Sequence, residues 1–188
     1  MSDLIQNHAF LASSYAIASL ACLYAAARNT QAADKDARDF SSGRYFWFTL
    51  SAALCLLAIA KLTGLQAFVG GQVRELARDD NLYDLRHPYQ RAGNVAICIA
   101  AVAVFASGYL LWGKSSAWLA VPLGAAVILV AFVSVRALSL HEVDTLMYRR
   151  HLLGTQFGAL IEFTLTTLVV ITALVAGVLA KRASSTRA

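Results

Sequence analysis

Charged residues are scarce in this chain: they make up 14% of its 188 residues, whereas a soluble globular domain carries about 25%. A chain with so little polar surface cannot cover a water-facing fold. The bilayer accepts such a composition, provided that the backbone satisfies its own hydrogen bonds in helices or in a closed barrel. The apolar runs are long and do not alternate with polar residues, which favours helices over a barrel.

Cysteine pairs and a secretory signal are also missing. Cys22, Cys55 and Cys98 all lie inside apolar runs with no Cys-x-x-Cys spacing, so we exclude a disulfide scaffold and expect small buried hydrophobic residues. The first apolar run has no positive region before it, because Asp3 is the only charged side chain there. We therefore expect this run to be a retained span and not a cleaved signal peptide.

Long apolar runs are what the chain has instead. A membrane span needs about 20 apolar residues. Five runs meet this requirement, and we expect an all-α bundle of five transmembrane helices that forms one membrane domain over residues 1–188, with a polar tail at 181–188. The expected spans are residues 8–27, 45–69, 93–112, 117–135 and 158–180.

The connections between the runs differ in length. The turn at residues 113–116 is so short that the third and fourth spans must be antiparallel neighbours. The second and fourth loops are long enough for short helices at the membrane interface. Residues 72–78 have helical apolar spacing, and Ser139 with Glu142 forms a capping box that predicts a helix over 140–150.

Five spans place the N-terminus and residues 70–92 and 136–157 on one side of the membrane, which we call the site side. Each side carries eight lysines and arginines, so the total does not decide the orientation. The first span has no basic residue before it and four soon after it. This asymmetry favours a cytoplasmic location for the loop at residues 28–44 and for the C-terminus. The site side is then expected to face the periplasm of a bacterial inner membrane.

Three ionisable residues lie in or at the edges of the spans, all toward the site side: Lys61, Arg136 and Glu162. A charge inside a bilayer is a functional hypothesis by default, since it costs about 2.5–3.5 kcal/mol at the membrane centre. The alternative is that Lys61 and Arg136 extend to the headgroups. The Glu162 side chain is too short to do so, and Lys61 is the simplest ion-pair partner for it. All four histidines lie on the site side as well.

An anion site is our first hypothesis for these residues. Arginine, lysine, glutamine and tyrosine at an interface suit a phosphate or carboxylate group, which arginine binds through paired charge-assisted hydrogen bonds. The alternative is a solvated face with ordinary contacts to lipid phosphates. The candidates are Lys61, Gln66, Arg74, Tyr83, Arg86, Gln90 and Arg136.

A metal site is the second hypothesis, and it would make the protein a metal-dependent membrane enzyme. His141 and Asp144 share one face of the predicted 140–150 helix, and His87, His151 or Glu162 can complete a ligand set. No spacing matches a His-Glu-x-x-His signature, and no catalytic residue can be named. The sequence leaves open whether the protein is an enzyme and whether it holds a cofactor.

A third hypothesis is an accessory subunit of a larger membrane complex. Small residues recur at helical spacing in the first span, with Ala12, Ala16 and Ser19 on one row, which suits close helix packing. The expected partners are therefore membrane lipid, other membrane subunits or a second copy of the chain. We expect no nucleic-acid partner.

One pattern covers about half of the chain. It consists of Phe46, Trp47, Lys61, Leu65, Gln66, Arg74, Ala77, Tyr83, Arg86 and Gln90, then Arg136, Ala137, Leu138, Ser139, His141 and Asp144. This pattern resembles that of a widespread group of small bacterial multi-pass membrane proteins. Members tend to carry an acidic residue where Gly64 stands, a tryptophan at Leu82, and two adjacent histidines where His141 is followed by Glu142. The last difference removes a candidate metal ligand. The resemblance implies a membrane location and no particular activity.

Overall fold

A computed structural model describes residues 2–32, 39–65, 68, 71–72, 86–113, 117–138, 151–152 and 155–185. Within these residues the fold is helical, apart from one antiparallel pairing of β1 (His151–Leu152) with β2 (Thr155–Gln156). A π-helical turn, Tyr109–Gly113, and a 3-10 turn, Ala117–Leu119, lie between the third and fourth long helices. The five long helices are α1 (Ser2–Ala32), α2 (Asp39–Leu62), α4 (Arg86–Gly108), α5 (Ala120–Leu138) and α7 (Phe157–Ser185).

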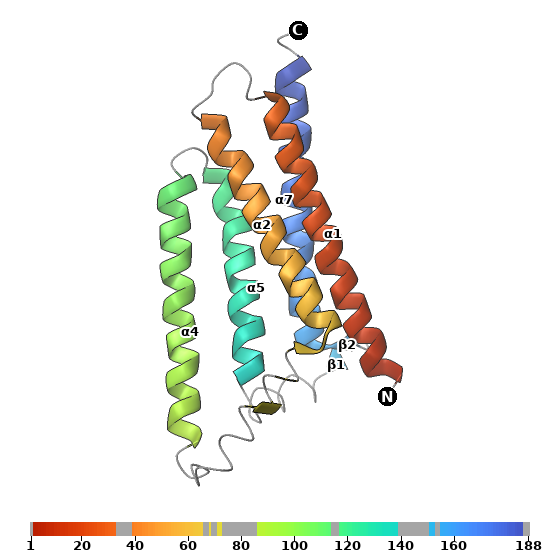
Figure 1. Cartoon of the computed structure of the whole chain (residues 1–188), viewed down its shortest axis with the longest axis vertical. Helices are drawn as coiled ribbons and strands as arrows, with labels where there is room; N and C mark the ends of the chain where they lie inside the picture. Colours follow the sequence, from red (N-terminus) through yellow and green to blue (C-terminus); the bar gives the residue numbers. More distant parts are fainter. Residues whose placement is uncertain are drawn as a thin grey trace.

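Successive helices run in opposite directions, so the two chain ends lie at opposite ends of the bundle (Figure 1). Helix α1 packs along both α2 and α7, and α5 packs against α7 and α4. Helix α4 is the outermost member. It contacts α5 and stands away from α2 (Figure 1).

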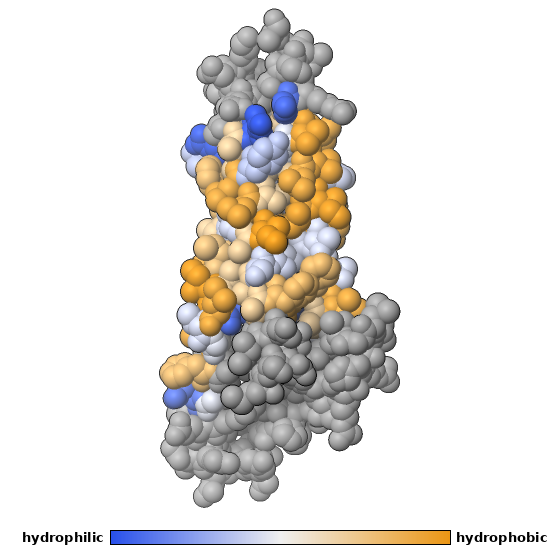
Figure 2. Space-filling model, turned by 90° about the vertical axis from the view of Figure 1, so that its right-hand side faces the viewer, coloured by the Kyte–Doolittle hydropathy of each residue, from blue (hydrophilic) through white to orange (hydrophobic). Residues whose placement is uncertain are grey.

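Four of the helices are long and apolar enough to cross a membrane, as an integral membrane protein requires. Their spans are Ala9–Asn29, Gly43–Leu62, Ala92–Leu111 and Phe157–Lys181. The fifth apolar stretch, Ala120–Arg136 in α5, is shorter. At about 1.5 Å per residue it reaches roughly 25 Å, against a hydrocarbon core of roughly 30 Å. The number of spans therefore stays a prediction. Hydrophobic side chains cover much of the described face in Figure 2.

The core lies where α1, α2, α5 and α7 meet. Trp47, Leu54, Leu129 and Val169 are almost completely buried there, against the small residues of α1. The expected small-residue rows of the first span are partly confirmed, since Ala12 and Ser19 are buried while Ala16 is exposed. Small side chains let the backbones of α1 and its neighbours approach closely.

The packing of the helices decides which aromatic and cysteine side chains face outward, and the expectation of buried cysteines is wrong for two of the three. Phe46 and Trp47 are buried in the core, with their rings 5.0 Å apart, because α2 turns this face toward α1. Cys22 is buried as expected, but Cys55 and Cys98 are exposed on the outside of the helices. Exposed apolar positions are favourable for a helix whose outer face meets lipid.

Helix α2 ends at Leu62, short of the expected Val69. Gly64 follows with φ +67, the left-handed conformation that ends many helices and suits glycine. Leu65, Phe68, Gly71 and Gln72 are helical again, and the Phe68 amide donates to the Gly64 carbonyl at 3.1 Å. The chain therefore breaks its helix close to Lys61. The interfacial helices expected at 72–78 and 140–150 lie outside the described residues, except for Gln72.

Candidate functional site

Glu162 is completely buried, although it is an acidic residue in an apolar helix. It lies in the second turn of α7, close to the site side. Its backbone carbonyl accepts a hydrogen bond from the Thr166 hydroxyl at 2.7 Å. A buried carboxylate needs several donors to replace water, so its partners define the site.

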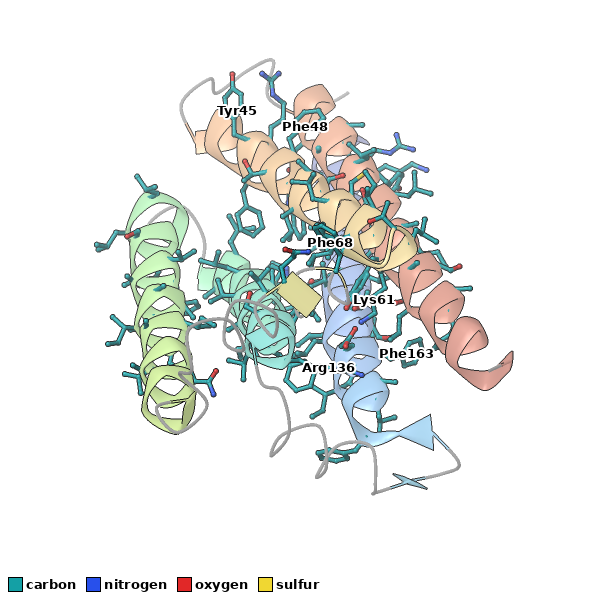
Figure 3. The ribbon with its side chains drawn as sticks, turned by 60° about the horizontal axis from the view of Figure 1, so that its bottom comes forward. Tyr45, Phe48, Lys61, Phe68, Arg136 and Phe163 are labelled. Carbon is teal, nitrogen blue, oxygen red and sulfur yellow. The ribbon has the colours of Figure 1, made fainter. Side chains whose placement is uncertain are left out.

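Three side chains from three other helices donate hydrogen bonds to the Glu162 carboxylate. The Tyr15 hydroxyl of α1 donates to Oε2 at 2.5 Å. The Lys61 ammonium of α2 donates to Oε2 at 2.9 Å and to Oε1 at 3.2 Å. The Arg136 guanidinium of α5 donates to Oε1 at 2.8 Å. We call Tyr15, Lys61, Arg136 and Glu162 the carboxylate cluster, and Figure 3 shows Lys61 and Arg136 extending toward α7.

The carboxylate cluster joins two cations and one carboxylate in a nearly dry place. The side chain of Lys61 is 4% exposed, and that of Arg136 is 16% exposed. Desolvating charges in this way costs several kcal/mol per ion, and close geometry with further hydrogen bonds is what offsets it. The cluster therefore depends on all its members at once. Arg136 is its most accessible charged member.

Contacts of α1 with α2 and with α7 set the positions of the helices that carry the cluster. One turn from Tyr15 along α1, the hydroxyl of Ser19 lies 2.9 Å from that of Ser51 in α2, and each hydroxyl also contacts the other residue's backbone carbonyl. These reciprocal hydrogen bonds fix the position of α1 along the axis of α2. Near the other end, a Cβ at Gly177 of α7 would meet the Tyr24 ring of α1 at 2.5 Å. The glycine therefore permits the close approach of α1 and α7.

The structure brings together Lys61 and Arg136 from the expected anion set and Glu162 from the expected metal set. Arg86, Gln90 and His87 lie in the first two turns of α4, and His151 lies in β1; only their backbone positions are described. These elements begin or end on the site side, as does α1 with His8 (Figure 1). The remaining candidates lie outside the described residues: Gln66, Arg74, Tyr83, His141 and Asp144.

A metal centre gains no support from the part of the chain that the structure describes. No group of three or more histidine, cysteine, aspartate or glutamate side chains converges there. Glu162 is instead surrounded by two cations and a phenol, which are donors and not metal ligands in this arrangement. A divalent cation beside Lys61 and Arg136 would be repelled by both.

Tyr15 is the member of the site that sequence reasoning missed. It lies in the middle of an apolar, alanine-rich run, where the pattern indicates only helix packing. One signal was available: a buried tyrosine hydroxyl usually finds a partner, and a span that contains a tyrosine away from its ends therefore predicts a polar neighbour. The identity of that neighbour depends on the packing of α1 against α7.

Comparisons with protein-family models, with curated proteins and with solved structures found no match to this chain. The carboxylate cluster is therefore interpreted from its own geometry.

Proposed function

We propose that this integral membrane protein binds an anionic headgroup or a small anion at its site side. The observation that carries the proposal is the convergence of Lys61 and Arg136, from two different helices, at one end of the bundle. The backbone of Arg86 lies at the same end (Figure 1). The expected loop candidates Gln66, Arg74 and Tyr83 belong to the segment that connects α2 with α4.

The arrangement of hydrogen-bond donors at the site, and not the net charge of the site side, must select the anion. With five spans, the site side carries eight basic and eight acidic residues, so its formal net charge is zero. An anion then gains little from long-range attraction, which salt also screens within about 8–10 Å. Arginine can still bind it at close range, through a planar set of donors that matches phosphate or carboxylate oxygens.

The role of Glu162 in this proposal is to position Arg136. The hydrogen bond of 2.8 Å restricts the guanidinium of a side chain that otherwise has many rotamers. A donor that is already oriented loses less conformational entropy when a ligand binds. Lys61 lies deeper, and it supports the position of Glu162 through two hydrogen bonds.

Binding of phosphatidylglycerol and of inorganic phosphate to the purified protein in a neutral detergent tests the proposal. We expect Arg74→Ala and Arg136→Gln to weaken both at least fivefold relative to wild type. Lys181→Ala is the matched control, because it removes one exposed cation near the other end of the bundle, and it should bind like wild type. A thermal unfolding curve for each variant shows that it is folded. Equal binding by wild type, Arg74→Ala and Arg136→Gln would refute the proposal.

A further inference from the structure

The carboxylate cluster contains a carboxyl group that can lose its charge and still accept hydrogen bonds. Lys61 and Arg136 donate to Glu162, and neither cation has an acceptor atom, because ammonium and guanidinium groups carry only N–H donors. When a carboxylate binds a proton, it gains an O–H donor and keeps a carbonyl oxygen as acceptor. Protonation of Glu162 therefore removes the negative charge of the cluster, while one oxygen still accepts from Arg136.

The hydrogen bonds of the cluster favour one of the two carboxylate oxygens as the place for a proton. Oε1 accepts from Arg136 at 2.8 Å and from Lys61 at 3.2 Å, and both of these groups are donors only. Oε2 accepts from the Tyr15 hydroxyl at 2.5 Å. Among the described partners of Glu162, Tyr15 alone can also accept, because a phenol oxygen has lone pairs. A proton on Oε2 therefore has an acceptor, and Oε1 stays available to Arg136.

Arg136 is the place where the cluster reaches the surface of the bundle. Its side chain is 16% exposed, whereas that of Lys61 is 4% exposed and that of Glu162 is completely buried. Arg136 lies in the last turn of α5 and Lys61 in the last turn of α2. Figure 3 brings this end of the bundle forward and shows both cations there. An anion or a proton from the water on the site side therefore meets the cluster at Arg136.

An anion on Arg136 and the ionised carboxylate of Glu162 repel each other. Both accept hydrogen bonds from one guanidinium, and the bond to Oε1 is 2.8 Å long. Acceptors on different edges of a guanidinium lie roughly 6–8 Å apart. At this separation and an effective dielectric constant of about 20, the repulsion lowers the affinity for a singly charged anion about 30- to 100-fold. A proton on Glu162 removes this repulsion.

The groups around Glu162 determine how a pH dependence can be assigned. Within the described residues, the titratable or charged groups that face it are Tyr15 from α1, Lys61 from α2 and Arg136 from α5. Strand β2 (Thr155–Gln156), which also packs against α7, contains none. Histidines ordinarily change charge near neutral pH, and all four are expected on the site side. Variants must therefore separate Glu162 from the histidines.

We infer that this site binds its anion together with a proton: Oε2 of Glu162 takes one proton from water on the site side when a singly charged oxyanion binds Arg136. This inference rests on the proposed anion binding and specifies its regulation. One negative and one positive charge enter together, so the net charge of the cluster does not change. Anion affinity therefore rises as the pH falls, and Glu162 orients Arg136 in both states.

The test uses two phosphodiesters, phosphatidylglycerol and dimethyl phosphate, as the lipid and the free form of the same anion. Each keeps a single negative charge from about pH 5 to about pH 8, whereas a phosphate monoester changes charge near pH 6. Isothermal titration calorimetry of the purified full-length protein in a neutral detergent measures the affinity. Repeating the titration in buffers with different ionisation enthalpies gives the number of protons taken up.

Three variants assign the proton to its group. Glu162→Gln keeps an acceptor for Arg136 but carries no charge, as the protonated acid does. Glu162→Asp is the matched control, because it keeps a carboxyl group that can bind a proton. A variant in which all four histidines are replaced by glutamine removes their titration. Thermal unfolding shows which variants are folded.

We expect wild type to take up at least about half a proton per anion and to bind at least fivefold more tightly at about pH 5 than at about pH 8. Glu162→Gln should bind at least tenfold more tightly than wild type at about pH 8, with no proton uptake and less than a twofold change with pH. Glu162→Asp and the four-histidine variant should keep the pH dependence. A purely structural role of Glu162 predicts the reverse, which is weaker binding by Glu162→Gln.

Three results overturn the inference: binding by wild type without proton uptake, a folded Glu162→Gln that keeps the pH dependence, or a pH dependence that disappears with the histidines. If Glu162→Gln does not fold, the four-histidine variant decides, because proton uptake by it supports the inference and a lack of uptake overturns it. Proton uptake with both phosphodiesters, or with phosphatidylglycerol alone, supports the inference, and the second result assigns the site to a lipid headgroup.

The same titrations separate this inference from the proposed function. If neither phosphodiester binds wild type at any pH, the proposed anion binding is refuted, and the inference fails with it. If both bind and Arg136→Gln weakens them, but no proton is taken up, the anion site stands and only the coupling to a proton is refuted.

Discussion

Neutralising Glu162 gives the sharpest test of the carboxylate cluster. Glu162→Gln keeps the size of the side chain but removes the negative charge that Lys61 and Arg136 share. Breaking a buried ion pair by removing one partner costs about 3–5 kcal/mol. We therefore expect the free energy of unfolding to fall by about this amount. Lys61→Met should cost less, about 1.5–3 kcal/mol, because Arg136 and Tyr15 still donate to the carboxylate.

The double variant separates the ion cluster from a simple loss of packing. Once Glu162 is neutral, removing the Lys61 charge relieves the repulsion between Lys61 and Arg136. The Glu162→Gln, Lys61→Met double variant should therefore be more stable than the sum of the single changes predicts, by about 1–3 kcal/mol. Lys181→Met is the matched control, since it removes an exposed lysine from the same helix as Glu162 and should change stability little.

Unfolding in mixed micelles with an increasing fraction of sodium dodecyl sulfate measures these free energies. The buried Trp47 of the core provides a fluorescence signal, and circular dichroism follows helix content. The reasoning is refuted if Glu162→Gln costs less than about 1 kcal/mol, or if the two changes are additive. Either result would mean that the cluster is solvated in the membrane and that the helices are held by apolar packing alone.

Three further predictions follow from the same contacts. Tyr15→Phe removes the shortest hydrogen bond to the carboxylate and should lower the free energy of unfolding by about 1.5–3 kcal/mol in the same micelle assay, while an unchanged stability would exclude Tyr15 from the cluster. Gly177→Ala should destabilise the protein by about 1–3 kcal/mol through contact with the Tyr24 ring, and Tyr24→Ala should cancel most of this added cost; failure of that rescue would place the strain elsewhere. If α5 crosses the membrane as the fifth span, reporter fusions at the two termini should report opposite sides, and the same side for both would contradict five spans.

Much of the fold could be predicted from the sequence because bilayer thickness dictates the length of an apolar run. The five long helices correspond to the five expected runs. Helix α2 ends earlier than expected, near Gly64, because the apolar run continues past this glycine and gives no sign of the break. Helix type and antiparallel order follow from local sequence. The way in which the helices face one another does not, as the buried Phe46 and Trp47 show.

The same distinction applies to the candidate site. A carboxylate that cannot reach the headgroups needs a partner nearby, so the ion pair of Glu162 with Lys61 followed from side-chain length and depth. Tyr15 did not follow, because its position beside Glu162 depends on which face of α1 meets α7 and on how closely these two helices pack. These are properties of tertiary packing, and small apolar residues carry little information about it.

The hydrogen bond between Lys61 and Glu162 also constrains how the protein is made. The two residues are 101 positions apart, and the lysine is synthesised first. At about 5–20 residues per second, the ribosome reaches Glu162 roughly 5–20 s after Lys61. During this interval α2 must enter the bilayer before Glu162 has been synthesised. Because Lys61 lies in the last turn of α2, its ammonium can extend to the headgroups until α7 is inserted. The carboxylate cluster can form only after α7 has been inserted, because Tyr15, Lys61 and Arg136 all bond Glu162 of that helix. A ribosome that stalls before α7 therefore leaves the two buried cations without their carboxylate.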